Sequence, residues 1–382
     1  PQNDQDIVTT GGTGFGLMAI LVGIERDFIT REQAFKRFTR VVDFLEKADR
    51  FHGAWPHWLD GKTGKVKAFS KKDDGGDLVE TAFLIQGLLT VSEYFKNGNQ
   101  QEKELVAKID QLWKEVEWSW YTKNNESVLY WHWSPNYGWE MNFPVGGYNE
   151  CLIMYVLAAA SPTYPISKET YDIGWAKNGK IVSSEVYYGE EVVLDYYEHD
   201  DKSIGPLFWA HYSYLGLNPT GLKDQYADYW KLTQNHAKIH YNYAVHNPKN
   251  FKGYGENIWG LTSSYSMNGY SEHSPEHDLG VISPTAALSS FPYTPNESMK
   301  MLKYLYQYAD KYIGKYGPYD AFSDEYNWLS PRYLAIDQGP IPVMIENYRS
   351  GLLWNLFMNN KDVKTGLIKL GFESSVYKYN KL

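Results

Sequence analysis

Polar loops marked by glycine or proline lead directly into segments that are apolar on almost every side, and this pattern occurs six times along the chain. The clearest case is residues 72–83, where KDDGGD runs into LVETAF. A helix that is apolar all round must be buried. The pattern therefore predicts six buried inner helices, of which the other five begin near Gly12, Gly147, Ser203, Pro284 and Pro340.

Amphipathic segments follow the apolar ones. In residues 31–49, Phe35, Phe38, Val42 and Leu45 recur at spacings of three and four, which predicts a helix with one buried face. Similar stripes occupy residues 101–121, 222–245 and 296–313, a weaker one occupies 167–175, and 361–370 follows the last apolar segment.

This alternation predicts an all-α fold, an (α/α)6 toroid or six-hairpin barrel, as a single domain over residues 1–382. An open α-solenoid is the alternative, but its inner row would be less uniformly apolar. Because a toroid places the loops that precede its inner helices on one rim, we expect the functional site there.

Five long loops return the chain from outer to inner helices, and their tryptophans favour ordered, functional loops over disordered ones. The loops span residues 51–75, 122–146, 176–202, 247–283 and 315–339. One of them predicts a small β-hairpin, with strands in 180–186 and 191–197 on either side of a turn at Tyr188-Gly189.

Composition narrows the ligand class. Aromatic residues make up 16% of the chain, and Tyr and Trp combine an apolar face with a polar tip, which suits sugars. The net charge of −9 without a basic stripe excludes nucleic acid, and no apolar run is long enough to predict a membrane span. With one Cys and no HExxH motif, we expect neither a metal nor another cofactor.

Three acids surround two glycines at the start of the second inner helix. Gly75 and Gly76 permit an unusual turn, and Asp73, Asp77 and Glu80 flank it. Since a helix N-terminus stabilises ionised carboxylates, these acids favour ligand binding or a base over a proton donor. Ordinary helix capping is the alternative.

Glu150 opens the third inner helix in the segment PVGGYNECLI. Its apolar neighbours predict a raised carboxyl pKa, as a general acid requires. The alternative is a capping-box glutamate.

Asp337 lies just before the last inner helix, with Asp320, Asp324 and Glu325 upstream in the same loop. Glu346 follows two turns into that helix, where it could reach the lumen. For each of these acids the alternative is a solvated surface position.

Carboxylates contributed by different loops, with aromatic residues between them, favour glycosidic bond cleavage. One acid protonates the leaving oxygen, while a second carboxylate activates water or attacks the sugar. Composition leaves open which acid plays which role. The candidate substrate-binding residues beside the acids are Glu325 and the possible stacking platforms Trp55, Trp131, Trp133, Trp259 and Trp328.

Five segments together resemble the bacterial glucoamylase-like proteins of glycoside hydrolase family 144. They are VTTGGTGFG at 8–16, FHGAWPHW at 51–58, DDGGDLVET at 73–81, GGYNE at 146–150 and DQGP at 337–340. The resemblance implies an (α/α)6 barrel that hydrolyses β-1,2-glucan, or oligosaccharides such as sophorose, with inversion at the anomeric carbon. The older name, glucoamylase, implies α-1,4-glucan instead.

By motif position, the resemblance implies that Glu150 is the proton donor, that Asp337 is the base, and that Asp73, Asp77 and Glu80 line the substrate cleft. It also implies a periplasmic or extracellular bacterial protein. Such relatives carry another helix before residue 8, so an outer helix is missing here unless residues 361–370 fill its place. We further expect a monomer.

Two other classes compete with a β-glucan hydrolase or an α-glucan hydrolase of the glucoamylase type. A non-catalytic glycan-binding protein of an uptake system would also be helical and aromatic, but buried paired carboxylates would only cost it desolvation. A toroidal lyase needs Tyr, His and Arg near a uronic acid, and only Arg332 and Arg349 are available late in the chain.

Overall fold

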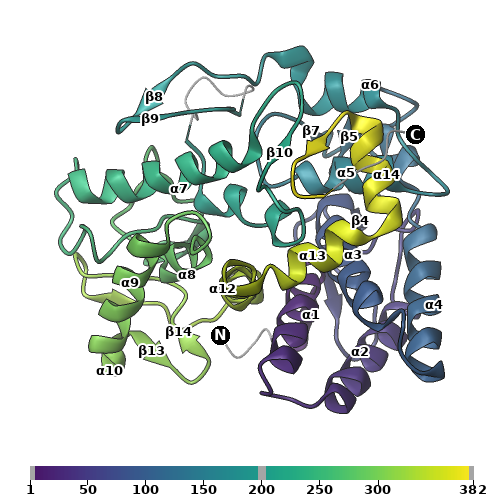
Figure 1. Cartoon of the computed structure of the whole chain (residues 1–382), viewed down its shortest axis with the longest axis horizontal. Helices are drawn as coiled ribbons and strands as arrows, with labels where there is room; N and C mark the ends of the chain where they lie inside the picture. The colour runs from purple at the N-terminus through teal and green to yellow at the C-terminus, as the bar shows by residue number, and fades with distance from the viewer. Residues whose placement is uncertain (1–4, 197–203, 378–382) are drawn as a thin grey trace.

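The computed structural model describes residues 5–196 and 204–377 (Figure 1). The described part is mostly helical, as predicted, with small antiparallel sheets of two or three strands in its loops. Five of the predicted inner helices are present, and they are α1 (Thr10–Glu25), α3 (Leu78–Phe95), α5 (Leu152–Ala160), α8 (Pro284–Ser289) and α12 (Pro340–Ser350).

The prediction of a continuous fourth inner helix is wrong. Ser203 lies outside the described residues, and the segment that follows forms two short 3-10 turns, η4 (Leu207–Ala210) and η5 (Ser213–Leu215). Pro206 fixes the chain immediately before η4, and the segment is dense in aromatic residues that favour helices only weakly. The apolar pattern therefore predicted correctly that this segment is buried, but a buried segment need not be a regular helix.

The outer helices are α2 (Arg31–Leu45), α4 (Gln100–Lys114), α7 (Tyr229–His246) and α9 (Pro295–Gln307). Capping boxes begin α2 and α4, with Thr30 and Asn99 as the respective N-caps. The weaker stripe forms only α6 (Lys168–Thr170) and a π-helical turn, η2 (Tyr171–Trp175).

The last helices are α13 (Leu352–Asn359), which packs on α3, and α14 (Lys361–Leu370), which packs on α5. Gly366 of α14 approaches so closely that an added Cβ would lie 2.6 Å from that of Ala160. Residues 361–370 therefore lie beside α5 and do not fill the place of an outer helix next to the first inner one. No helix in the described ranges is both long and apolar enough to span a membrane.

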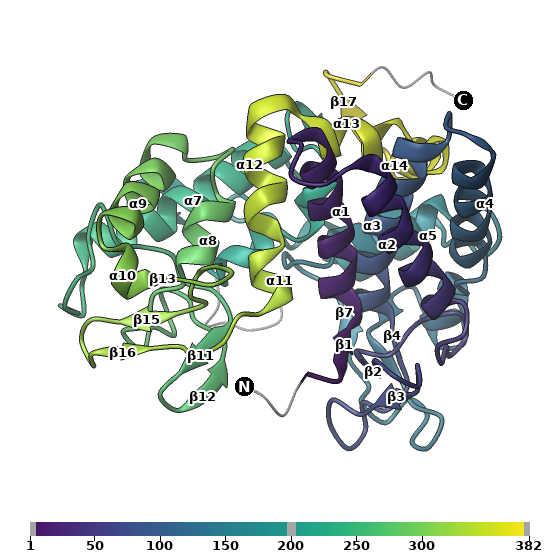
Figure 2. The ribbon, with the colours of Figure 1, turned by 90° about the horizontal axis from the view of Figure 1, so that it is seen from below.

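Most of the short strands gather at the end where the inner helices begin, while α13, α14 and β17 lie at the opposite end (Figure 2). The strand-bearing end holds β1 (Ile7–Thr9), β2 (Trp58–Asp60) and β3 (Val66–Lys67) in one sheet. The paired strands are β4 (Gly76–Asp77) with β6 (His132–Trp133), β5 (Leu129–Tyr130) with β7 (Pro144–Val145), β11 (Ser264–Ser266) with β12 (Gly269–Ser271), β13 (Ile313–Gly314) with β14 (Gly317–Pro318), β15 (Phe322–Ser323) with β16 (Trp328–Leu329), and β10 (Leu222–Lys223) with β17 (Glu373–Ser374).

The predicted β-hairpin is confirmed but is shorter than expected. Strands β8 (Val186–Tyr187) and β9 (Glu190–Glu191) pair around Tyr188-Gly189, and one further bridge joins Val182 to Leu194. Tyr197, the last residue of the predicted second strand, lies outside the described residues.

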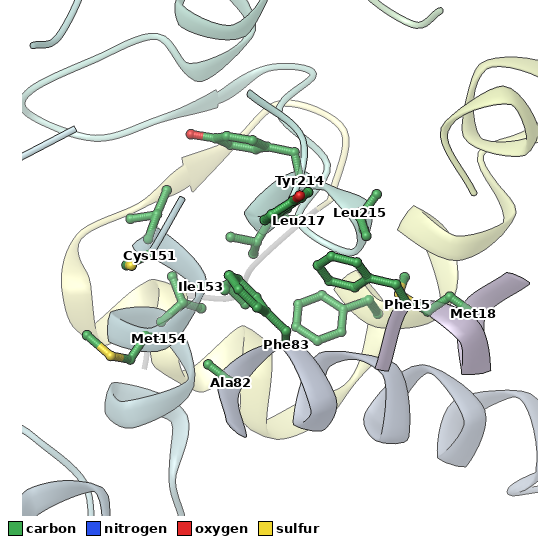
Figure 3. Close-up of a cluster of buried hydrophobic side chains, with 14 of the residues drawn as sticks. Phe15, Met18, Ala82, Phe83, Cys151, Ile153, Met154, Tyr214, Leu215 and Leu217 are labelled. Atoms are coloured by element: carbon green, nitrogen blue, oxygen red, sulfur yellow. The ribbon is translucent and has the colours of Figure 1, made fainter. Parts of the chain in front are cut away.

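Side chains from successive inner elements meet in one core. Phe15 and Met18 of α1, Phe83 of α3, Ile153 of α5 and Leu215 of η5 point toward one another (Figure 3). The single cysteine, Cys151, is buried in the same cluster, as predicted.

Two glycines bring α1 and α3 into close contact. A Cβ on Gly14 would lie 2.2 Å from the carbonyl oxygen of Phe83, and a Cβ on Gly87 would lie 2.2 Å from that of Gly14. Backbone thus packs on backbone, which leaves no room for a side chain.

We predict that Gly14→Ala lowers the free energy of unfolding by about 1–3 kcal/mol, because the new methyl group overlaps the backbone of α3. Gly16→Ala in the same helix is the matched control, since nothing lies within 4 Å of its Cβ. Better helix propensity should make that variant neutral or more stable by up to about 1 kcal/mol. Urea unfolding followed by tryptophan fluorescence measures both, and equal stabilities would contradict the packing argument.

Candidate active site

The pairing of β4 with β6 places Asp77 opposite His132 at the start of α3. This pairing depends on the two glycines of the DDGGD segment. A Cβ on Gly75 would lie 2.1 Å from the carbonyl oxygen of Trp133, and one on Gly76 would lie 2.0 Å from the Tyr121 hydroxyl. The glycines therefore let this loop press against its neighbours.

Asp77 is fully buried and bonded through both carboxylate oxygens. Oδ1 accepts a hydrogen bond from the Glu80 backbone N–H at 2.8 Å, which is a helix cap, and Oδ2 pairs with His57 Nδ1 at 3.0 Å. Burial alone would raise the pKa of Asp77, but the hydrogen bond from His57 and the proximity of His132 lower it below its ordinary value. Asp77 therefore stays ionised, as predicted, and caps the helix as well.

Glu80 behaves differently, although it lies only one turn further along α3. Its Oε2 accepts a hydrogen bond from the Gly11 backbone N–H at 2.7 Å. Burial raises the pKa of Glu80 to about 7, and the charge of Asp77 adds to this against the opposing effect of His57. The expectation that the helix N-terminus favours the ionised form does not hold for Glu80, because burial and like charge outweigh that effect.

His57, Asp73 and Asp77 offer ligand atoms within 4.8 Å of one another, and His132 Nδ1 lies 3.5 Å from Asp73 Oδ1. One imidazole and two carboxylates could hold a divalent cation only if His57 were neutral. Burial lowers the pKa of His57, but the charges of Glu80 and Asp77 outweigh it and raise the pKa to about 9. A protonated His57 therefore supplies positive charge to the cluster.

Glu150 lies in the turn that leads into α5 and is 9% exposed. Its backbone carbonyl accepts a hydrogen bond from the Ser213 hydroxyl, which ties the turn to η5. Burial raises the pKa of Glu150 to about 8, with further contributions from the charges of Glu272 and Glu80. The predicted raised pKa is confirmed. The capping alternative is wrong, because Cys151 is the N-cap and no side chain caps the helix.

Asp337 lies in α11 (Ala335–Gln338) and is 4% exposed, so it is not a solvated surface acid. The Tyr212 hydroxyl donates a hydrogen bond to Asp337 Oδ1 at 3.0 Å. Burial and the charge of Asp320 raise the pKa of Asp337 well above its ordinary value, against the lowering effect of Tyr212.

Tyr212 interacts with both predicted catalytic acids, with Asp337 by a hydrogen bond and with Glu150 electrostatically. Burial raises the pKa of its hydroxyl, and the charges of Asp337 and Glu150 raise it further, which places both acids within electrostatic reach of one phenol. Tyr270 of β12 is 52% exposed. The pKa of its hydroxyl is likewise raised by burial and by the charges of Asp337, Asp320 and Glu80. Acids from separate loops thus converge at the strand-bearing end, where solvent reaches Tyr270.

The tryptophans divide into two groups. Trp55 and Trp259 are 0% exposed, and their indole N–H groups donate to the carbonyl oxygens of Leu45 and Glu297. Their predicted role as stacking platforms is wrong, because a fully buried ring has no free face. Partly exposed rings remain candidates, and these are Trp131, Trp133 and Trp328.

Two further acids lie in other settings. Glu325 is exposed and accepts a hydrogen bond from the Lys252 backbone N–H at 2.9 Å, and no contact in the described part of the chain brings it to the other acids. Glu346 pairs with Arg26 at 2.5 Å and bonds Ser350, so the expectation that it reaches the lumen is wrong.

The sequence analysis missed His57, His132, Tyr212 and Tyr270. Both histidines stand beside tryptophans, in PHW and WHW, so their position among aromatic residues was a usable signal. The two tyrosines carried no usable signal in the sequence, because they could not be told apart from the other tyrosines among the 33 in the chain.

Comparison with known proteins identifies close relatives. Residues 142–361 match the family model described as "Putative glucoamylase". The chain is 47% identical to the exo β-1,2-glucooligosaccharide sophorohydrolase (non-reducing end) of Parabacteroides distasonis, and the match covers 96% of this chain and 53% of that protein. The chain thus spans about half the length of this curated relative.

Solved structures agree with this match. An endo-β-1,2-glucanase from Chitinophaga pinensis, in complex with sophorotriose and glucose, is 62% identical with a TM-score of 0.95, and the match covers 98% of this chain and 90% of that one. A β-1,2-glucanase from Parabacteroides distasonis is 46% identical with a TM-score of 0.91, with 96% and 55% covered.

We predict that His57→Gln removes pH-dependent stability. The raised pKa of His57 means that its ion pair contributes fully below about pH 6.5 and is lost as the pH rises through about 9. The stability difference between wild type and variant should therefore shrink by about 3 kcal/mol across this window. Urea unfolding at several pH values measures it, with the exposed His246→Gln as control. A constant difference would show that His57 is not charged in the folded state.

Proposed function

Since the chain belongs to the glucoamylase-like family, we propose that it is an inverting glycoside hydrolase that cleaves β-1,2-linked glucan or gluco-oligosaccharides. The observation that carries the proposal is Tyr212, whose hydroxyl donates a hydrogen bond to Asp337 and whose pKa is also raised by the charge of Glu150. The names of the relatives support the linkage, since they act on β-1,2-glucan or its oligosaccharides.

Glu150 is the proton donor of the proposed reaction. Burial raises its pKa to about 8, so the carboxyl keeps its proton at neutral pH and can pass it to the oxygen of the leaving sugar. The turn that holds it is fixed to η5 by the Ser213 hydroxyl. A donor on a fixed turn loses little free energy in reaching its reactive geometry.

Asp337 is the base, which takes a proton from the water that attacks the anomeric carbon. The hydrogen bond from Tyr212 stabilises its ionised form and fixes the direction of the carboxylate. In the proposed division of labour, Glu150 keeps its proton, and the donor from Tyr212 favours the ionised form of Asp337 against burial and the charge of Asp320, which raise its pKa.

Asp73, Asp77 and Glu80 hold sugar hydroxyls in this proposal. Their carboxylates accept hydrogen bonds, while His57 and His132 next to them hold the acids in place and balance their charge. Sugar rings stack on the partly exposed rings of Trp131, Trp133 and Trp328.

The closed (α/α)6 toroid is part of the same proposal. In its support, α1 contacts α3, α3 contacts α5, α5 contacts η5, and α12 contacts both α8 and α1. The structural likeness to β-1,2-glucanases adds to this support. A monomer that acts in the periplasm or outside a bacterial cell completes the proposal.

Two modes of cleavage fit the relatives. The Chitinophaga pinensis enzyme is an endo-glucanase, whereas the curated Parabacteroides distasonis relative releases sophorose from the non-reducing end. We favour the endo mode, because that relative is more similar and the match covers nearly its whole length. A purely glycan-binding role is disfavoured. Burying so many carboxyl groups costs free energy of desolvation, and a protein that only binds glycan gains no catalysis from it.

The function is tested by incubating the protein with β-1,2-glucan, β-1,3-glucan and amylose, while NMR follows the anomers of the products. We expect reducing ends from β-1,2-glucan alone, and the α-anomer first, because inversion of a β-linkage gives an α-product. Products of mixed length indicate endo cleavage, and sophorose alone indicates exo cleavage. Binding without hydrolysis, or hydrolysis of amylose, would contradict the proposal.

We predict that Glu150→Gln keeps the fold but lowers kcat on β-1,2-glucan by about 1,000-fold, because the amide cannot protonate the leaving oxygen. Glu140→Gln is the control, since that exposed glutamate pairs with Lys72 on the surface and should keep wild-type activity. Circular dichroism checks folding, and reducing-end assays measure the rate. Full activity in a folded Glu150→Gln protein would exclude Glu150 as the donor.

A further inference from the structure

Phe69 is a large apolar side chain that is 47% exposed in the loop that carries Asp73. This loop follows β3 at the strand-bearing end (Figure 2). The Phe69 backbone N–H donates to the Asp73 carbonyl oxygen at 2.9 Å, and the Asp73 N–H donates to the Ser70 carbonyl oxygen at 3.1 Å. One short turn therefore presents both a candidate substrate-binding acid and an exposed aromatic ring.

The ring of Phe69 belongs to a cluster of three aromatic rings. Its centroid lies 4.2 Å from that of His57 at an interplanar angle of 29°, and 4.8 Å from that of Trp58 at 68°. His57 Nδ1 pairs in turn with Asp77 Oδ2 at 3.0 Å. The cluster is thus continuous with the buried acids, and Phe69 is its most exposed member.

Backbone and side-chain contacts hold this cluster on both sides. Trp58 is the first residue of β2, where it pairs with Thr9 of β1 and with Lys67 of β3. On the other side, Asp74 Oδ2 accepts a hydrogen bond from Asn136 Nδ2 at 2.7 Å, which ties down the end of the turn. Because the exposed ring is fixed before a ligand arrives, little ordering is left for binding to bring about.

A single exposed apolar side chain is common and has no special meaning. Phe69 differs because its ring continues the candidate site. Since His57 stacks on one face of this ring, its exposed surface is turned away from Asp77. The surface is only one ring wide, with the partly exposed Trp58 next to it, which is too small for a protein partner but matches one sugar unit.

We propose that Phe69 is the stacking platform of a distal sugar subsite, which binds a glucose unit of β-1,2-glucan beyond the units held by Asp73, Asp77 and Glu80. The apolar C–H face of the sugar lies on the exposed surface of the ring, as aromatic side chains with polar neighbours allow. This inference rests on the proposed function and extends it, because only a chain long enough to pass the acids reaches Phe69. The ring contributes to binding and takes no part in proton transfer.

Phe69→Ala tests the subsite on β-1,2-gluco-oligosaccharides of increasing length and on the polymer. KM for the polymer should rise about five- to tenfold, with kcat changed less than about twofold, because one stacking contact is lost while the acids stay in place. For the shortest oligosaccharide that wild type cleaves, KM should stay within about twofold of wild type. Phe69→Trp should restore the KM for the polymer, since it keeps a flat ring.

Phe28→Ala is the matched control. Phe28 is 81% exposed, and it follows the end of α1, away from the strand-bearing end at which α1 begins. Loss of this ring removes a comparable apolar surface far from the acids, so KM and kcat should match those of wild type at every chain length.

The other outcomes overturn the proposal. An unchanged KM for the polymer in Phe69→Ala means that the ring contacts no sugar. A kcat that falls equally at every chain length means that the ring only holds His57 in place. A KM that rises equally at every length places the sugar next to the cleaved bond. If wild-type protein hydrolyses no β-1,2-glucan, the proposed function itself fails, and the subsite fails with it.

A second measurement follows binding without turnover. Calorimetric titration compares Glu150→Gln protein with the double variant that also carries Phe69→Ala. Kd for β-1,2-glucan should be about five- to tenfold higher for the double variant. Equal Kd values for the two proteins would exclude the subsite and leave the proposed function standing.

Discussion

Buried negative charge is the constraint on which the rest of this site depends. A carboxylate without a partner is expensive to bury, and this protein gathers several at the ends of its inner helices. Asp77 meets the constraint with a protonated His57, whereas Asp337 has a phenolic donor from Tyr212 that only partly offsets the rise of its pKa caused by burial and by Asp320. Glu150 meets it by keeping its proton. These different solutions are what assign the acids different chemical roles.

The scaffold and the site share their contacts. The glycines that let α1 lie backbone to backbone on α3 also bring the first turn of α1 to the acids, where the Gly11 N–H donates to Glu80. A Cβ on Gly11 would lie 2.6 Å from the Glu80 carboxylate. Close helix packing therefore fixes the position of an acid in addition to excluding water from the core.

The sequence predicted the parts of this arrangement that depend on local pattern. Most of the segments predicted to be apolar all round are buried, and Asp73 and Asp77 at the start of α3 lie together with His57. What it could not predict depends on contacts between distant segments. Asp77 lies opposite His132 of β6 and pairs with His57 from the loop before β2, and no local sequence pattern predicts these contacts. Trp55 and Trp259 were misassigned because composition does not tell which side of a loop faces the core.

Asp320 and Asp324 show the same limit within one loop, because they stand four residues apart and were equivalent in the sequence. Asp320 is fully buried, whereas Asp324 bonds Lys311 and Tyr312. Asp320 is held inward because Gln338 donates to the Pro318 carbonyl before it and Phe322 pairs with Ile282 after it. In the proposed function, a neutral sugar that enters the site displaces water without bringing charge. Its binding therefore strengthens the interactions among the acids it covers, because their charges then act in a lower dielectric. A site built on burial in this way becomes more strongly polarised when its substrate is bound.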